Sequence, residues 1–182
     1  LGAVALGLVN PWPANTVSRF APLHSACLLI ASARTQPVTD AVIALTAREP
    51  ALGHFDLGMA HFHAQRFAEA QREYQRALAS DTAGNRHQFD PNLARYYLGI
   101  ALTELRLTGP AREVYERLLA DDPGNVGARN NFAILLLRSG RPTEALEQVR
   151  ESLRRDPGSG TARRIEAEAL TLLASVASAE SP

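Results

Sequence analysis

Apolar positions recur with the period of an α-helix along most of the chain, and the pattern is clearest between residues 125 and 156. From Asn125 to Gly140, apolar side chains fall on one face of a predicted helix. A second stripe follows Pro142 and ends before Asp156, so the pattern predicts a helix hairpin. The stripes consist of Val126, Phe132, Ala133, Leu136 and Leu137, followed by Ala145, Leu146, Val149 and Leu153.

Glycine and proline mark the ends of the predicted helices. Gly140 is expected to end the first helix, because a residue without a β-carbon readily takes the left-handed cap conformation. Pro142 suits the first position of the next helix, where a backbone N–H would lack an intrahelical partner anyway. The predicted hairpin turns are, in chain order, Gln65-Arg66-Phe67, Thr108-Gly109-Pro110 and Ser139-Gly140.

This hairpin pattern occurs three times. The copies run LGMAHFHAQRFAEAQREYQRALASD from Leu57, LGIALTELRLTGPAREVYERLLADDP from Leu98, and FAILLLRSGRPTEALEQVRESLRRDP from Phe132. The second and third copies start 34 residues apart, and the first and second start 41 apart, which places seven extra residues within 82–89. A repeat of this length predicts a stacked array, in which each hairpin buries its apolar face against its neighbours.

The predicted organisation is therefore an all-α solenoid of antiparallel helix pairs. A long helix from Thr161 to Ala179 carries one apolar stripe and a charged outer side, as expected of a helix that caps the array. The predicted segments are an apolar, Pro-rich segment at 1–16, a degenerate helix hairpin at 17–50, repeats at 51–84, 92–125 and 126–159, an insertion loop at 85–91, a capping helix at 160–179 and a tail at 180–182.

The three copies resemble the tetratricopeptide repeat (TPR) family. In each first helix a large apolar residue precedes a small one, at Leu57-Gly58, Leu98-Gly99 and Phe132-Ala133. Each second helix carries an alanine and, four residues on, a large residue; these are Ala70, Ala111 and Ala145, with Tyr74, Tyr115 and Val149. The closing proline is present as Pro123 and Pro157 but replaced by Thr82 in the first copy. The resemblance implies a right-handed superhelix whose concave face is lined by the first helix of each hairpin.

By the same resemblance, the concave face forms an apolar groove that we predict to bind a partner. Many family members hold a peptide carboxylate there with Lys, Asn and Arg, but of the matching positions here only Asn131 agrees. An apolar or amphipathic helical segment is therefore the predicted ligand. The alternative is that the chain fills its own groove or that neighbouring hairpins bury it. The predicted groove residues are Phe55, Met59, Phe62, Tyr96, Ile100, Asn130, Ile134, Leu137 and Arg138.

The composition and the candidate motifs mainly argue against particular kinds of binding and catalysis. The 19 acidic residues balance 19 basic ones, all of them arginine, so net charge provides no attraction to nucleic acid. A lone Cys27 excludes an internal disulfide. His54, His61 and His63 lie close in sequence but lack a zinc-binding motif, and we interpret them as structural. Gly158-Ser159-Gly160 lacks the lysine of a nucleotide loop and is interpreted as an interhelix turn. No metal, cofactor, small-molecule substrate or catalytic residue is predicted.

The sequence thus predicts a protein-interaction scaffold rather than an enzyme. An alternative is the soluble TPR tail of a larger membrane-embedded bacterial enzyme, of glycan polymerase or ligase type, whose catalytic part lies outside this chain. The apolar start, LGAVALGLV, is interpreted either as the remnant of a membrane or signal segment or as a segment packed on the first helices. The first interpretation favours a periplasmic or membrane-associated location over a cytoplasmic one.

Overall fold

The computed structural model describes residues 46–81 and 89–179, and all regular elements in these ranges are α-helices. The segment at 1–16, most of the degenerate hairpin at 17–50, residues 82–88 around the insertion and the tail lie outside the described residues. Along the described residues, the chain divides into two compact units, with the boundary between Asp121 and Asp122. None of the described helices is both long enough and apolar enough to cross a membrane.

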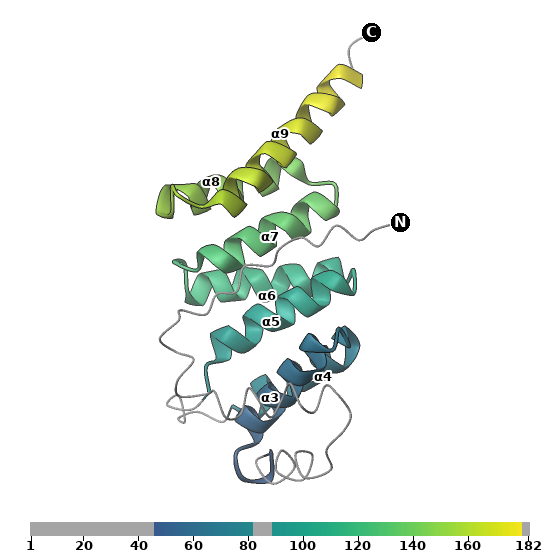
Figure 1. Cartoon of the computed structure of the whole chain (residues 1–182), viewed down its shortest axis with the longest axis vertical. Helices are drawn as coiled ribbons and strands as arrows, with labels where there is room; N and C mark the ends of the chain where they lie inside the picture. The colour runs from purple at the N-terminus through teal and green to yellow at the C-terminus, as the bar shows by residue number, and fades with distance from the viewer. Residues whose placement is uncertain (1–45, 82–88, 180–182) are drawn as a thin grey trace. The chain divides into compact units, whose positions relative to one another are not determined.

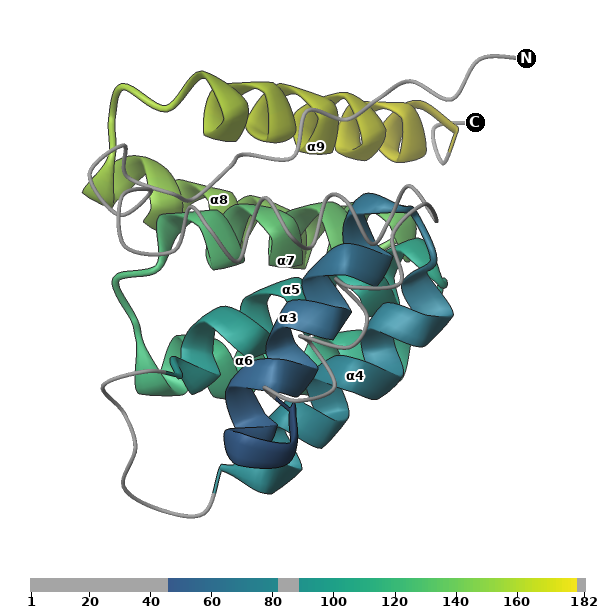
Figure 2. The ribbon, with the colours of Figure 1, turned by 60° about the horizontal axis from the view of Figure 1, so that its bottom comes forward.

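The described part of the first unit consists of two helix hairpins in series. Helices α3 (Pro50–His63) and α4 (Phe67–Ser80) form one pair, and α5 (Pro91–Glu104) and α6 (Thr108–Asp121) form the next. Helix α4 packs on α5, and α3 also contacts α5, so the two hairpins are stacked (Figures 1 and 2). Asp90 caps α5 by accepting a hydrogen bond from the backbone N–H of Asn92 at 2.8 Å, ahead of Pro91.

Close contact between the two helices of each hairpin depends on glycine. A β-carbon added to Gly58 of α3 would lie 2.5 Å from the ring of Tyr74 on α4. The same substitution at Gly99 of α5 would place a β-carbon 2.6 Å from the ring of Tyr115 on α6. Both tyrosines are fully buried, so the rings have little room to move. The small residue of the repeat thus makes space for the large residue of the second helix.

The three hairpins share one turn geometry. Gln65, Arg106 and Gly140 have φ values of +57°, +58° and +71°, and each follows the last residues of a first helix. In each turn the next backbone N–H returns to a carbonyl five residues earlier, as from Arg66 to His61 at 2.9 Å, which is the Schellman arrangement. The predicted stop at Gly140 and start at Pro142 agree with this geometry.

The prediction for the second turn is wrong. Residues Thr108, Gly109 and Pro110 form the start of α6, and the turn lies before them, with Arg106 in the left-handed conformation. Pro110 is tolerated because the first N–H groups of a helix have no intrahelical partner. The left-handed position therefore carries a side chain in this hairpin, although Gly109 is only three residues away.

The second unit contains a hairpin and one long helix. Helices α7 (Val126–Arg138) and α8 (Pro142–Arg155) form the pair, and α9 (Gly160–Ala179) packs on both (Figure 2). Val149 of α8 and Ile165 of α9 are completely buried. The predicted fold class, an all-α solenoid of antiparallel helix pairs ending in a capping helix, is confirmed.

Two junctions in this unit repeat the same local structure. The segments 122–129 and 156–163 read DPGNVGAR and DPGSGTAR. In each, the aspartate accepts the N–H of the following glycine, and an arginine side chain donates to the carbonyl of the proline. These bonds join Arg129 to Pro123 at 2.9 Å and Arg163 to Pro157 at 2.6 Å. Asn125 and Ser159 occupy matching cap positions, accepting the N–H groups of Ala128 and Ala162.

Candidate functional site

Most of the predicted groove residues are buried in the structure. Phe62 is partly exposed and Arg138 is exposed. A side chain that is buried packs the array and is not accessible to a partner in this state, so a role for these residues in binding stays a prediction. The seven buried residues are Phe55, Met59, Tyr96, Ile100, Asn130, Ile134 and Leu137, each with at most 9% of its surface exposed.

Two of these buried residues bind the second helix of their own hairpin. The hydroxyl of Tyr74 on α4 donates to the sulfur of Met59 on α3 at 3.2 Å. In the second unit, the hydroxyl of Ser152 on α8 donates to the side-chain oxygen of Asn130 on α7 at 2.7 Å, in a buried position. Polar groups buried in this way stabilise the fold because each has a partner. Met59 and Asn130 therefore have a structural role inside their hairpins.

Aromatic rings from four segments form a continuous cluster in the first unit. Tyr97 of α5 is at its centre, with ring centroids 5.3 Å from Phe62, 6.2 Å from Tyr74 and 6.4 Å from Phe55. Tyr97 is edge-on to Phe62, tilted against Phe55 and stacked on Tyr74, and the distances are in the range that aromatic pairs favour. We call this group the aromatic cluster; it consists of Phe55, Phe62, Phe67, Tyr74, Phe89 and Tyr97.

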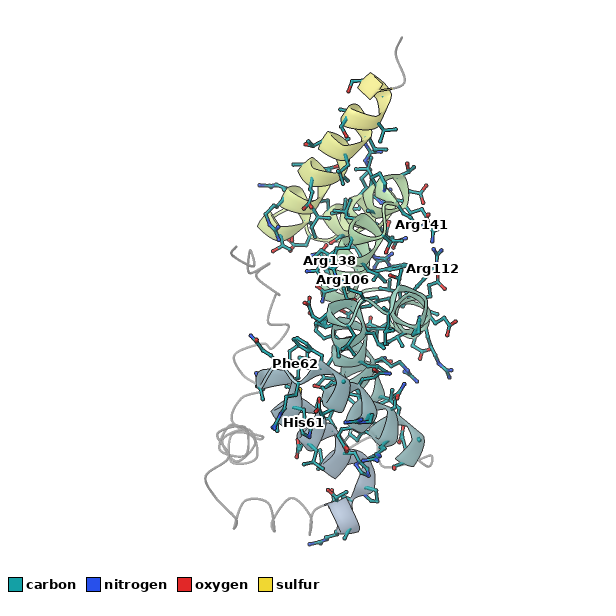
Figure 3. The ribbon with its side chains drawn as sticks, turned by 90° about the vertical axis from the view of Figure 1, so that its right-hand side faces the viewer. His61, Phe62, Arg106, Arg112, Arg138 and Arg141 are labelled. Carbon is teal, nitrogen blue, oxygen red and sulfur yellow. The ribbon has the colours of Figure 1, made fainter. Side chains whose placement is uncertain are left out.

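Phe62 is the member of the predicted groove through which the aromatic cluster reaches solvent. It lies near the end of α3, next to His61 (Figure 3). The centroid of its ring lies 5.6 Å from that of Phe67, 5.3 Å from that of Tyr97 and 6.1 Å from that of the exposed His63, and all three pairs are edge-on. Phe67, at the start of α4, is also partly exposed. The result is an apolar side chain at the surface that is fixed in position by its neighbours.

Burial raises the pKa of two groups on the described helices of the first unit. It raises the pKa of Asp56, on α3, to about 7 because the charged carboxylate loses its hydration. Burial, with a smaller effect of Tyr96, raises the pKa of Tyr97 to about 12. Tyr97 therefore remains a neutral phenol at physiological pH, in keeping with its place inside the aromatic cluster.

The three clustered histidines have separate environments. Nδ1 of His54 lies 2.8 Å from a carboxylate oxygen of Glu73 on α4, and Glu73 also pairs with Arg76 at 2.6 Å. Burial, followed by the charge of Arg66, lowers the pKa of His61. In the described part of the chain no three His, Cys, Asp or Glu side chains are grouped as metal ligands would be. His54 thus links α3 to α4, as a structural residue does.

Sequence comparison decides the family. Two models described as tetratricopeptide repeat match the chain, one over residues 55–126 and the other over 110–174. Together they extend from the first helix pair into the capping helix. The chain belongs to the tetratricopeptide repeat (TPR) family. None of the curated proteins matches the sequence.

Solved structures share the TPR fold at low sequence identity. The TPR domain of Arabidopsis OM64 has a TM-score of 0.58 at 19% identity, covering 65% of this chain and 92% of its own. The first TPR of Spaghetti (RPAP3), bound to the HSP90 peptide SRMEEVD, has a TM-score of 0.60 at 16% identity. The match covers 68% of this chain and 93% of that structure. YrrB, a TPR protein with an unusual peptide-binding site, has a TM-score of 0.60 at 21% identity. The match covers 87% of this chain and 78% of that structure.

The carboxylate-binding pattern of other TPR proteins is not reproduced in the first unit. The matching positions hold Phe55, Met59 and Tyr97, which are buried and belong to the hairpin interior or the aromatic cluster. None of the three provides a cation or an amide. Asn131, the one residue that agrees with the pattern, lies on α7 with 5% of its surface exposed. The sequence interpretation that disfavours a carboxylate clamp is consistent with these positions.

Proposed function

We propose that this chain is a protein-interaction scaffold that binds an apolar or amphipathic helical segment of a partner protein. TPR arrays generally act as non-catalytic scaffolds, and RPAP3 and YrrB are described respectively as bound to a peptide and as having a peptide-binding site. The proposal gives this chain no catalytic role of its own. It places the first contact with the partner at Phe62.

The observation that carries the proposal is the partial exposure of Phe62 over a buried aromatic cluster. An exposed aromatic residue that is already held by Phe67 and Tyr97 loses little side-chain freedom on binding. Rigid aromatic anchors of this kind carry much of the binding free energy in protein interfaces. The site presents aromatic rings, which suit a leucine or phenylalanine of the partner.

This proposal restricts the predicted binding residues to those that solvent can reach. Ile100 has only 3% of its surface exposed, so a charged residue there is expected to disrupt packing as well as binding. Phe62 is a better test position because it already contacts solvent. Leu107, in the turn before α6, provides a matched control: it is an apolar residue with 41% exposure that lies outside the aromatic cluster.

The test is fluorescence anisotropy with two labelled peptides. One is an amphipathic helical peptide with leucines at positions i, i+3, i+4 and i+7, and the other is the acidic peptide SRMEEVD. We expect the protein to bind the first and not the second. Phe62→Asp should weaken binding of the helical peptide by about tenfold or more, whereas Leu107→Asp should not.

Circular dichroism of each variant separates loss of binding from loss of folding. Equal weakening by Leu107→Asp would show that the contact is not at Phe62. Preferential binding of SRMEEVD, or of neither peptide, would contradict the proposed ligand class.

A further inference from the structure

The capping helix α9 extends past the helices on which it packs. It has 20 residues, whereas α8 has 14 and α7 has 13. At 1.5 Å per residue, α9 is about 9 Å longer than α8. Its beginning is fixed by the bond from Arg163 to the carbonyl of Pro157, in the turn that follows α8, and by the complete burial of Ala162 and Ile165. The additional length is therefore at its carboxyl-terminal half.

One apolar stripe continues from the packed half of α9 onto the unpacked half. Ala162, Ile165 and Ala169 have no exposed surface. Three and seven residues beyond Ala169, on the same face of the helix, Leu172 has 38% and Val176 has 52% of its surface exposed. The face that is covered by α7 and α8 at one end is thus open at the other.

The open half of α9 also lacks charge. No Asp, Glu, Arg or Lys occurs between Ala169 and Ala179, and Leu170, which lies off the stripe, is 46% exposed. The outer face of α8, by contrast, carries ion pairs such as Arg155 with Glu151. An apolar stripe along a helix is normally buried against another element. We call this surface the α9 end; it consists of Leu172, Leu173 and Val176.

We propose that the α9 end packs against the α9 end of a second copy of this chain, as an antiparallel two-fold pair. A two-fold interface brings each residue opposite the same patch of its partner, so it suits a surface without like charges. The charged residues of α9 lie in its first half, at Arg163, Arg164, Glu166 and Glu168, and point away from the other copy in an antiparallel arrangement. The contact extends the stripe that already binds α9 to α7 and α8.

The size of the surface sets the expected strength of this pair. Two helix ends of about ten residues bury well below the ~1,600 Å² of a standard interface. The dimer should therefore be weak and should form with rising protein concentration, in the micromolar range or above. This proposal does not depend on the aromatic cluster or on the peptide proposed above.

The test is sedimentation velocity of the whole chain over a concentration series. We expect the wild-type protein to shift from monomer to dimer, and the double variant Leu172→Glu/Val176→Glu to remain monomeric. The matched control is Thr171→Glu/Ala174→Glu, which adds the same charge to exposed positions on the opposite side of the same helix. The control should dimerise like the wild type. A wild type that stays monomeric throughout, or a stripe variant that dimerises as strongly as the control, overturns the proposal.

A cysteine pair tests the same contact without adding charge. In a Cys27→Ser background, Val176→Cys should form a covalent dimer on mild oxidation, seen at twice the mass on a non-reducing gel. Ala174→Cys, on the other side of α9, should cross-link much more slowly. Equal cross-linking at both positions would show that the disulfides form by random collision and not at a specific interface, which would contradict the proposal.

Discussion

At the scale of single residues, Asp56 ties the stability of the first hairpin to pH. Burial raises the pKa of its carboxyl group from 3.8 to about 7 in the folded protein. Between these two values the folded state holds a proton that the unfolded state releases. The folding free energy therefore becomes less favourable as the pH rises from about 4 to about 7. Below pH 4 the group is protonated in both states and has no such effect.

We predict that Asp56→Asn stabilises the protein at pH 7.5 and has a much smaller effect at pH 4. The expected gain at the higher pH is on the order of 2–4 kcal/mol, since one pKa unit corresponds to about 1.4 kcal/mol. Urea unfolding at both pH values measures it. Glu113→Gln, at an exposed position of α6, is the control and should show no comparable gain. A gain for Asp56→Asn that is the same at both pH values would contradict the prediction.

The sequence predicts which residues pack better than it predicts which remain accessible. The pairs Gly58 with Tyr74 and Gly99 with Tyr115 follow from the repeat, and the structure gives their steric reason. Met59 and Ile100 are predicted to line a groove, yet both are buried. Helical periodicity identifies the face on which a side chain lies. How deeply that face is covered depends on neighbouring helices and on hydroxyl partners such as Tyr74, which periodicity does not reveal.

At the scale of elements, the hairpin turns store a small amount of strain. Gln65 and Arg106 adopt the left-handed conformation that glycine occupies at the third turn. For a residue with a β-carbon this conformation costs roughly 1–2 kcal/mol. The same Schellman hydrogen bonds form in all three turns, so the cost comes from the side chain and not from missing bonds.

We predict that Arg106→Gly raises the free energy of unfolding by about 1 kcal/mol, because it removes this strain. The reverse change, Gly140→Arg, should lower it by a similar amount. No atom lies within 4 Å of a β-carbon added at Gly140, so a collision cannot explain such a loss. Chemical denaturation of the two variants measures both effects. Destabilisation by Arg106→Gly would show that the arginine side chain makes a compensating contact.

The elements themselves are largely predictable from sequence, and the exceptions are local. The second turn is misplaced because Gly109 and Pro110 are strong turn signals, while Arg106 adopts a conformation that its residue type disfavours. The junction DPG-x₃-AR, present at 122–129 and 156–163, is visible in the sequence but does not follow from helical periodicity. Its structural role is visible only in the folded chain, where Arg129 and Arg163 donate hydrogen bonds to proline carbonyls.

At the scale of the whole molecule, the repeat establishes the family but not the partner. Spacing and small–large pairs place the chain among TPR proteins, because these features are required for helices to stack. Partner choice depends on side chains that the stacking leaves exposed, and these differ between family members. In this chain we propose that they are Phe62 in the first unit and the α9 end in the second.

The bond from Arg163 to Pro157 has a consequence for how the second unit loses its structure. A cation that donates to a backbone carbonyl makes a strong hydrogen bond, and this one holds the first turn of α9 to the turn that follows α8. Toward the opposite end of α9, Leu172 and Val176 are exposed to solvent. Unwinding should therefore start at the carboxyl end and advance toward Gly160, so backbone amides exchange with deuterium earliest near Val176 and latest near Ile165.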